Sequence, residues 1–556
     1  MSRRSRTLRT LLGGVRRRMV RDRTVAGHPA DRALVETFTR QEVAGWLLVP
    51  PDTPACRVSL CLNDVAATEV VAHPEPGPAD GLQRRRFRFV LYDFWRFART
   101  TDTVSVRYGE RPILLSVRNS YGYHPKTDGL STPEELITLL RSGHIFGQGG
   151  KIQLGKVIDT GWQDQVLRLH AAVHRQLEAE FGLRTFLGYG TLLGHVRDHG
   201  FIDHDRDFDC AYLARHPDPA AAAQQLITIA ESLVRKGFQV IPKASCLAIK
   251  DVDSGTAQID LFHLVGRPDG SVGFPFGSVG SAPLPVSAIE PLQPATLAGR
   301  PVLVPAVPAA VVEHLYGPGW RVPDPGFSWL TARTTRESRA LLDHDQQDRL
   351  YWTDFYARPD PLPPSPFARW VLDHPDLPGR AVDLGCGDGR DSGLLAAGGR
   401  SVLGIDRIPA AVALARGRTE EAAADFAEAD LNDAGALTAL LRQARGESDA
   451  PLLHYARGLA GTLTEPDWLT LLDRLAGSGR PGDVLALELR TDADRNRPKA
   501  NFRSVRRFPP PDQMISQLAD RGWTVLDREE GTGLSPYRTE DPALLRLLAR
   551  LSTRRQ

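Results

Sequence analysis

The sequence predicts a multidomain protein that combines a small N-terminal β-sandwich, a central α+β domain and a C-terminal α/β domain. Its 556 residues are too many for one hydrophobic core, because globular domains usually hold roughly 100–200 residues. The residue pattern also changes twice along the chain, from short alternating runs to helical periodicity and then to an alternation of strands and helices. The composition, with 42% hydrophobic and 24% charged residues, excludes a disordered or fibrous class.

Residues 1–30 are predicted to form a basic tail. Nine arginines and one aspartate fall within the first 25 residues. This composition fits either a solvated tail or a peripheral contact with the anionic inner face of a membrane, where each basic residue contributes about 1 kcal/mol. The apolar stretch "TLRTLLGGV" is too short for a secretory signal. The net charge of the whole chain is only +2, so no nucleic-acid partner is expected.

Cysteine usage and hydropathy predict a cytoplasmic protein. The cysteines are scattered, odd in number and without a C-x-x-C pair, which argues against a disulfide framework or a zinc site; they are Cys56, Cys61, Cys210, Cys246 and Cys386. No run reaches the roughly 18 apolar residues of a transmembrane helix. We therefore expect a cytoplasmic location, with the inner face of the plasma membrane as a surface that the basic tail could contact.

Residues 31–122 are predicted to form the β-sandwich. Runs such as "RVSLCLN" and "TVSVRYG" alternate apolar and polar residues between Pro, Gly and Asp, which is typical of short antiparallel strands. No catalytic constellation stands out here, so a binding or spacer role is the default. Contact with a glycan through the aromatic residues is one hypothesis, although aromatics in such sheets mostly belong to the core; they are Trp46, Phe94 and Trp95.

Residues 123–345 are predicted to form the α+β domain, and they carry an unusual run of acids. In "FIDHDRDFDCAYL" the side chains of Asp205, Asp207 and Asp209 would share one face of a strand. Such close like charges destabilise a fold unless a cation lies among them. Asp260, on the apolar strand "AQIDLFHLV", supplies a further carboxylate. We predict a Mg²⁺ or Mn²⁺ site formed by Asp207, Asp209 and Asp260, against the alternative of an acidic edge strand without a metal.

A glycine-rich turn precedes the acidic strand. The segment "GYGTLLG" leads into a helix, so the backbone N–H groups near Gly190 and Thr191 are placed to bind a phosphate. Arg197 follows two turns later and could pair with phosphate oxygens.

This set of motifs resembles the LicD family of nucleotidyltransferase-fold phosphotransferases, which includes bacterial phosphocholine transferases and the fukutin group. The resemblance covers roughly residues 145–330 and extends to "VLVPAVPAAVVEHLYGPGWRVPDP". It implies that Gly190 and Thr191 form the nucleotide-phosphate turn, that Asp207 and Asp209 bind metal, and that Asp260 is the third carboxylate. The family commonly has an aspartate where this chain has Arg206, so a second metal bound through that position is not expected.

The chemistry that the resemblance implies is attack by a glycan hydroxyl on the β-phosphate of a CDP-activated alcohol or alditol, with CMP as the leaving group. The metal would neutralise the developing phosphate charge. Asp260 or Asp205 could take the proton from the hydroxyl.

Residues 346–556 are predicted to form the α/β domain, whose strand–helix alternation follows the proline-rich linker at 358–370. Strands such as "AVDLG" and "SVLGID" alternate with helices, which predicts a parallel, doubly wound sheet. The glycines directly after the first strand allow close approach of a ligand; they are Gly385, Gly387 and Gly389. Alone they would equally fit a dinucleotide site. Asp406 and Asp430 follow the next two strands, placed for ribose hydroxyls and for an adenine amino group.

Together these residues resemble the class I S-adenosylmethionine-dependent methyltransferases, Rossmann-like enzymes, over about 200 residues. The resemblance implies S-adenosylmethionine as the cofactor; the residues that would bind it are Asp383, Gly385, Gly387, Gly389, Asp406 and Asp430. The basic segment "RTDADRNRPKANFRSVRRF" could form an anion-holding lid, and a solvated basic loop is an equal alternative.

The two resemblances predict a bifunctional enzyme of bacterial surface-glycopolymer assembly, such as that of a capsule or a teichoic acid. One domain would add a phospho-alcohol or phospho-alditol to a glycan, and the other would methylate the product. Two alternatives remain at this point: a nucleotidyltransferase that adds NMP to a small acceptor, and a non-catalytic glycan-binding scaffold.

Overall fold

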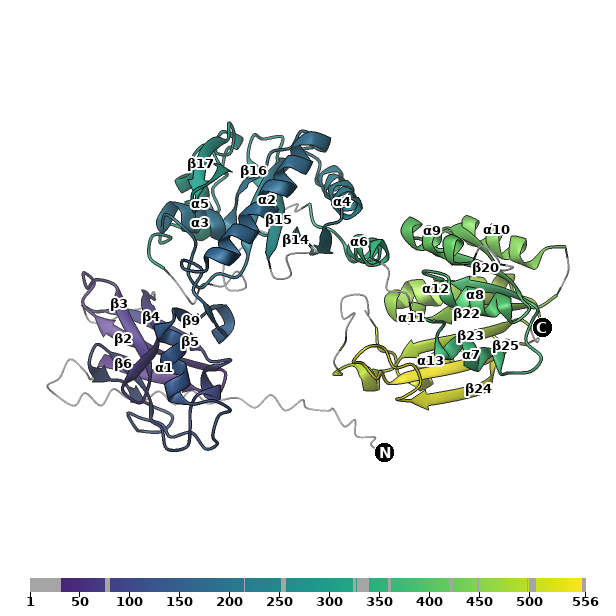
Figure 1. Cartoon of the computed structure of the whole chain (residues 1–556), viewed down its shortest axis with the longest axis horizontal. Helices are drawn as coiled ribbons and strands as arrows, with labels where there is room; N and C mark the ends of the chain where they lie inside the picture. The colour runs from purple at the N-terminus through teal and green to yellow at the C-terminus, as the bar shows by residue number, and fades with distance from the viewer. Residues whose placement is uncertain are drawn as a thin grey trace, which may run out of the picture. The chain divides into compact units, whose positions relative to one another are not determined.

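The computed structural model describes residues 32–552, apart from 76–80, 215, 252–256, 324–326, 328–339, 359–361, 420–423, 448–449, 498 and 500–506. The predicted basic tail therefore lies outside the described residues. The chain divides into two compact units, coloured from purple to yellow along the sequence in Figure 1. The first contains residues up to Ile158 together with Asp203–Arg206, and the second contains most of the remaining chain.

The first unit is built on an eight-stranded sheet with the order β7-β6-β3-β4-β5-β2-β1-β8. Its strands are β1 (Ala33–Phe38), β2 (Glu42–Val49), β3 (Cys56–Leu62), β4 (Val65–Pro74), β5 (Gln83–Val90), β6 (Val104–Tyr108), β7 (Arg111–Pro112) and β8 (Leu114–Leu115). Apolar side chains at alternate positions of these strands form one continuous core. The all-β prediction for this region agrees with these strands, and a sandwich of two packed sheets stays a prediction.

Helix α1 (Pro133–Arg141) and the hairpin of β9 (His144–Phe146) and β10 (Ile152–Leu154) also belong to the first unit. The side chain of Thr132 caps α1 by accepting a hydrogen bond from the N–H of Glu135. Leu136 of this helix is buried in the core of the eight-stranded sheet. The unit therefore continues to Ile158, beyond residue 122, where the sequence placed the end of the first domain.

The second unit begins with a mixed sheet of the order β11-β12-β15-β14-β13, with β16 paired to β15. Its strands are β11 (Phe186–Leu187), β12 (Phe208–Ala214), β13 (Gln239–Pro242), β14 (Cys246–Lys250), β15 (Gln258–Gly266) and β16 (Val272–Gly273). The helices of this part are α2 (Thr160–Phe181), α3 (Tyr189–Arg197), α4 (Pro219–Arg235) and α5 (Pro308–Tyr316), and β17 (Gln293–Leu297) and β18 (Arg300–Val304) form a separate hairpin. Both α2 and α4 contact β15, and among the described strands of this sheet β12 and β15 are the one pair that runs parallel.

The C-terminal part of this unit contains a seven-stranded sheet of the order β21-β20-β19-β22-β23-β25-β24, drawn in green and yellow in Figure 1. Its strands are β19 (Arg380–Leu384), β20 (Ser401–Asp406), β21 (Ala424–Glu428), β22 (Leu452–Arg457), β23 (Val484–Arg490), β24 (Trp523–Gly531) and β25 (Leu544–Leu551). The accompanying helices are α7 (Pro366–Leu372), α8 (Arg390–Ala397), α9 (Pro409–Arg418), α10 (Ala434–Arg445), α11 (Leu459–Thr462), α12 (Glu465–Ser478) and α13 (Pro511–Ala519).

The first five strands of this sheet are parallel and alternate with helices, which confirms the Rossmann-like prediction. Among the described strands of this sheet, the expectation of a parallel arrangement is wrong for β25, which pairs antiparallel with both β23 and β24. The reason is that the connection between β24 and β25 carries no crossover helix, so β25 returns beside β24 as a hairpin.

Helix α6 (His344–Ala357) begins two residues before the predicted domain boundary at 346. Asp343 and Gln346 cap it reciprocally. Its buried Asp354 accepts a hydrogen bond from the N–H of Val240 in β13 at 2.7 Å, and its Asp345 pairs with Arg407 at 2.5 Å. In the part of the chain that the structure describes, no helix combines the length and hydropathy required to cross a membrane.

Candidate functional site

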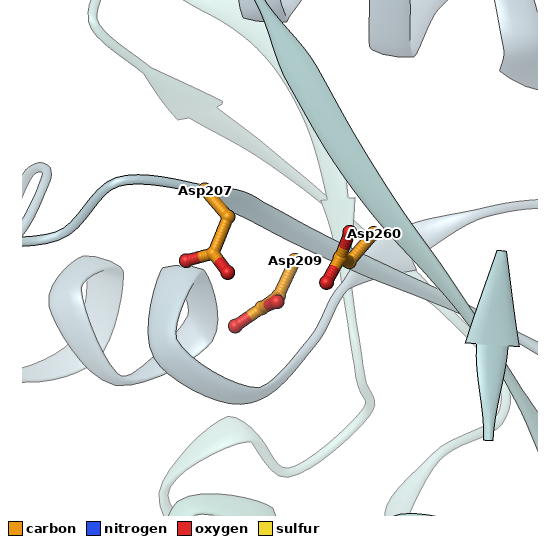
Figure 2. A group of neighbouring side chains, drawn as sticks. All are labelled: Asp207, Asp209 and Asp260. Atoms are coloured by element: carbon orange, nitrogen blue, oxygen red, sulfur yellow. The ribbon is translucent and has the colours of Figure 1, made fainter. Parts of the chain in front are cut away.

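Two carboxylates face each other at the start of a parallel strand pair. Asp209 of β12 lies directly beside Asp260 of β15 in the register of the sheet, so both side chains project from the same face. Asp209 is 9% exposed and Asp260 is 4% exposed. Asp207, just before β12, brings a further carboxylate, and one oxygen from each of the three residues lies within 4.8 Å of the others. Figure 2 shows these side chains gathered at the strand ends.

Strand β12 starts only at Phe208, so the prediction that Asp205 and Asp207 lie on the same strand as Asp209 is wrong, although Asp207 still joins the cluster. Residues Asp203–Arg206 belong to the first unit, where the carbonyl of Asp205 accepts a hydrogen bond from Gln153 and its carboxylate accepts one from the N–H of Arg206. The backbone turns there and is not extended. Asp205 is not among the clustered carboxylates, and its role as a base stays a prediction.

The glycine-rich turn is fastened to the acidic strand. The N–H of Gly190, in the first turn of α3, donates to the carboxylate of Asp209 at 2.8 Å, and the N–H of Asp209 donates to the buried Thr191 hydroxyl at 2.7 Å. Tyr189 between the glycines has a φ of 32°, a left-handed conformation that costs energy for a non-glycine residue. The turn thus orients Asp209, and its predicted role in binding a nucleotide phosphate stays a prediction.

Arg197 lies at the opposite end of α3, about 10 Å along the helix axis from Gly190. Its guanidinium donates to both carboxylate oxygens of Asp198, at 2.9 and 2.8 Å. The structure therefore does not bring Arg197 together with the other predicted phosphate-binding residues.

Lys243 is a residue of this site that the sequence did not reveal. It lies between β13 and β14, and its ammonium group pairs with the carboxylate of Asp260, which also accepts a hydrogen bond from Gln258 at 3.0 Å. Burial raises the pKa of Asp260, and the Lys243 charge opposes that rise. Burial alone would lower the pKa of Lys243, but Asp260 raises it above its ordinary value. Only the antiparallel pairing of β14 with β15 brings the two residues together, and no local motif signals it.

The three clustered carboxylates fit a divalent cation. They offer only oxygen donors, which suit Mg²⁺ and Mn²⁺. Two of them are buried, and Lys243 supplies one compensating positive charge for the group. Buried carboxylates that are not fully balanced are costly, so a bound divalent ion would remove the remaining repulsion.

A second candidate site lies at the carboxyl ends of β19, β20 and β22, where a pocket of about 330 Å³ opens. Gly385 and Gly387 line it with φ angles of 73° and 55°, which favour glycine. Asp406 accepts hydrogen bonds from the N–H groups of Gly387 and Ile408, both at 2.9 Å. Burial raises the pKa of Asp406, against those hydrogen bonds. Asp430 also lines the pocket.

Two predicted cofactor residues do not line this pocket. Asp383 is 2% exposed on β19 and accepts a hydrogen bond from the Ser392 hydroxyl at 2.6 Å, and burial raises its pKa to about 7. A Cβ atom at Gly389 would lie 2.7 Å from the Cβ of Ala415. This glycine therefore permits helix α8 to approach α9. Asp383 and Gly389 thus shape the fold around residues 385–389, the glycine loop.

The structure adds pocket residues that the sequence did not single out. Trp352 and Tyr356 of α6 cover the glycine loop, where a Cβ atom at Gly387 would lie 2.3 Å from the Tyr356 hydroxyl. Arg457, at the end of β22, also lines the pocket and donates to Asp391 at 2.7 Å. The aromatic segment "YWTDFYA" was visible in the sequence, but its spacing did not show that it faces the glycines.

Two basic residues of the segment predicted as an anion-holding lid, Arg490 and Lys499, bind groups within the fold. Arg490 pairs with Asp494 at 2.8 Å and also with Glu540. The ammonium of Lys499 donates to the carbonyls of Asp494 and Arg497, both at 2.7 Å. The side chains of Arg490 and Lys499 therefore stabilise the conformation of the segment. Residues 500–506 lie outside the described residues.

Comparison with protein families confirms both predicted domains. The family model "LicD/FKTN/FKRP, nucleotidyltransferase domain" matches residues 182–307. A methyltransferase domain model matches residues 378–447.

One curated relative is trans-aconitate 2-methyltransferase from Methylobacterium radiotolerans, 40% identical over 124 residues. The match covers 22% of this chain and 41% of the relative, less than half of its length. Among solved structures, the N-methyltransferase NodS from Bradyrhizobium japonicum with S-adenosylhomocysteine is 19% identical, covering 37% of this chain and 98% of that one at a TM-score of 0.28. The magnesium protoporphyrin IX methyltransferase from Synechocystis with bound S-adenosylmethionine is 17% identical, covering 33% and 76% at a TM-score of 0.25.

Proposed function

Since the chain contains a LicD domain and a methyltransferase domain, we propose that it is a bifunctional transferase of bacterial surface-glycopolymer assembly. The LicD domain transfers a phospho-alcohol or phospho-alditol from a CDP-activated donor to a glycan hydroxyl and releases CMP. The methyltransferase domain then methylates the product with S-adenosylmethionine. The observation that carries the proposal is the convergence of Asp207, Asp209 and Asp260 beside the glycine-rich turn.

In the LicD domain, the three aspartates would hold Mg²⁺ or Mn²⁺, which supplies charge neutralisation for the phosphate of the donor. Gly190 and Thr191 fix the orientation of Asp209 through its carboxylate and its N–H. Burial raises the pKa of Asp260, which suits a group that takes the proton from the attacking glycan hydroxyl. Lys243 balances part of the local negative charge.

In the methyltransferase domain, the cofactor supplies an activated methyl group. Gly385 and Gly387, which line the pocket, would allow its amino-acid end to approach the backbone, and Asp406 would accept hydrogen bonds from the ribose hydroxyls. Asp430 lies at the next strand end for the adenine amino group. Arg390, the first residue of α8 and part of the pocket lining, offers a positive charge to the cofactor carboxylate.

In this role the protein would act in the cytoplasm. The described cysteines are all free and buried, which suits a reducing compartment. The basic tail would contact the anionic inner face of the plasma membrane, where surface polymers are assembled.

The test uses the purified full-length chain with Mg²⁺, a panel of CDP-alcohols and CDP-alditols, and candidate glycans. We expect CMP, detected by mass spectrometry, from wild type but not from Asp209→Asn or from reactions with excess chelator. Pyrophosphate in place of CMP would instead support transfer of NMP to a small acceptor. Separate incubation with methyl-labelled S-adenosylmethionine should label the glycan product, and this labelling should be lost in Asp406→Asn.

A further inference from the structure

The methyltransferase pocket extends beyond the residues placed for the cofactor. Its far part lies at the ends of β23 and β25 and along the connection between β24 and β25, and it includes Glu488, Arg490, Ser535, Tyr537 and Leu544. This part is where a methyl acceptor would enter, if the pocket binds S-adenosylmethionine as proposed above.

The arginines of the pocket leave no cation for a negatively charged acceptor. Among the described lining residues, the cations are Arg390, Arg407, Arg457 and Arg490. Arg407 pairs with Asp345 and Asp348, Arg457 pairs with Asp391, and Arg490 pairs with Asp494 and Glu540. Arg390 lies beside the glycine loop, at the end of the pocket assigned to the cofactor. A phosphate or carboxylate acceptor would therefore be desolvated without a partner, which is costly.

The far part of the pocket instead presents one fixed carboxylate. Glu488 is 3% exposed, and its Oε2 atom accepts hydrogen bonds from Arg546 at 2.9 Å and from the Ser535 hydroxyl at 2.8 Å. Among the described residues, no hydrogen bond reaches its Oε1 atom, and this atom is not among the enclosed, unsatisfied ones. Oε1 can therefore accept a hydrogen bond from a molecule in the pocket.

Tyr537 adds a polar group that needs a partner. Its phenolic oxygen is buried, and among the described residues it has no hydrogen-bond partner. An unpaired buried hydroxyl costs about 1–3 kcal/mol. Because the Tyr537 side chain lines the pocket, a small rotation that exposes this oxygen to a polar ligand would recover that energy.

We infer that the methyl acceptor is an uncharged hydroxyl of a sugar or alditol, positioned by Glu488 and Tyr537, and not a phosphate or a carboxylate. In the reaction, the acceptor oxygen forms a bond to the methyl carbon while the bond from that carbon to sulfur breaks. The sulfur keeps the electron pair, which leaves neutral S-adenosylhomocysteine. The hydroxyl proton passes to Oε1 of Glu488, so atoms and charges balance.

The test incubates the full chain with methyl-labelled S-adenosylmethionine and two matched sets of acceptors. The neutral set is glycerol, ribitol and glucose, and the anionic set is glycerol 3-phosphate, ribitol 5-phosphate and trans-aconitate. We expect label in at least one neutral compound at a rate tenfold or more above that of its anionic counterpart. Preference for the anionic set, or no label in any neutral compound, would overturn the inference.

Variants identify the residues involved. Glu488→Gln should lower kcat for the best neutral acceptor about a hundredfold, while the KM for that acceptor and calorimetric binding of S-adenosylhomocysteine change little. Tyr537→Phe should mainly raise KM. The matched control is Glu529→Gln, because Glu529 also pairs with Arg546, at 3.1 Å, but does not line the pocket; its activity should equal that of wild type.

Several results distinguish the inference from the proposed function. If wild type does not bind S-adenosylhomocysteine, the methyltransferase half of the proposed function fails. If it binds the cofactor but Glu488→Gln and Glu529→Gln lose activity equally, Glu488 acts only through Arg546 and the inference fails. If Glu488→Gln does not fold, as judged by circular dichroism, Tyr537→Phe decides, and an unchanged KM would overturn the inference.

Discussion

Asp260 experiences two opposing influences at the proposed metal site. Burial raises its pKa, and the nearby Lys243 ammonium opposes that rise. A divalent cation bound to the Asp260 carboxylate would lie close to the Lys243 ammonium, which already neutralises that carboxylate. Lys243 therefore competes electrostatically with the metal.

Replacing Lys243 should strengthen metal binding. In Lys243→Met the apolar stem is kept while the charge is lost, so the three carboxylates present a more negative potential. We expect Mn²⁺ affinity, measured by calorimetry, to rise about tenfold, or about 1.4 kcal/mol. Lys236→Met is the matched control, since Lys236 is an exposed residue at the end of α4 and should leave the affinity unchanged. Unchanged or weaker binding in Lys243→Met would contradict this account.

Asp383 should make the stability of the methyltransferase domain depend on pH. Its pKa is about 7 in the folded protein against an ordinary value of 3.8, so between these values the folded state keeps a proton that the unfolded state has released. Stability therefore falls as pH rises through this window, by about 4 kcal/mol at most, and levels off above it. Asp383→Asn cannot ionise and should remove this dependence.

The measurement compares urea unfolding of wild type and Asp383→Asn at pH 5 and pH 8. The variant should be clearly more stable than wild type at pH 8 and gain much less at pH 5. The same difference at both pH values would show that Asp383 does not titrate in this range.

At the scale of elements, the contact between α3 and β12 shapes the candidate metal site. The Thr191 hydroxyl is buried and accepts the N–H of Asp209, so this one bond fixes both the helix start and the strand start. The N–H of Gly190 in the same turn donates to the Asp209 carboxylate. A change in the turn should therefore alter the position of this metal ligand.

Thr191→Val should therefore reduce both stability and metal affinity. The substitution keeps the shape but leaves the N–H of Asp209 without an acceptor, at a cost of about 1–3 kcal/mol. We expect a lower melting temperature and weaker Mn²⁺ binding, whereas Thr191→Ser keeps the hydroxyl and should retain most of both. If valine and serine behaved alike, the hydrogen bond would not be the cause.

The sequence predicts the elements of this site better than their details. Asp207, Asp209 and Asp260 could be picked out because charged residues on apolar strands are rare without a partner. Strand alternation alone could not show that β12 starts at Phe208, since Asp203–Arg206 make hydrogen bonds with residues outside the strand. Lys243 stayed hidden because its relation to Asp260 depends on the pairing of β14 and β15, which leaves no local pattern.

The C-terminal sheet was also predictable only in part. The strand–helix order predicted the parallel strands, and the glycines marked the pocket. The antiparallel β25 could not be predicted as part of a hairpin, because "LLRLLARL" is apolar enough to suit a helix or a strand. The pairing of Glu488 with Arg546 depends on that strand.

At the scale of the whole molecule, two distinct sites share one chain. A single substitution in either site should abolish the function of that site and leave the other intact. Asp209→Asn should abolish CMP release while S-adenosylhomocysteine binds normally, as measured by calorimetry. Asp406→Asn should weaken that binding at least tenfold, because its carboxylate contacts the glycine loop, and leave CMP release intact. Loss of both properties in either variant would show that the sites depend on one another.

The parallel register that joins Asp209 to Asp260 also determines how this region can tolerate changes in chain length. Because successive strand residues face opposite sides, deleting a single residue between Ala257 and Asp260 would turn the Asp260 carboxylate to the other face. It would then lie among the side chains that pack under α2 and α4, while Ile259 or Leu261 took its place beside Asp209. Insertions and deletions should therefore be accepted in the loops around these two strands, but an odd change in length within either strand would remove the site and the core together.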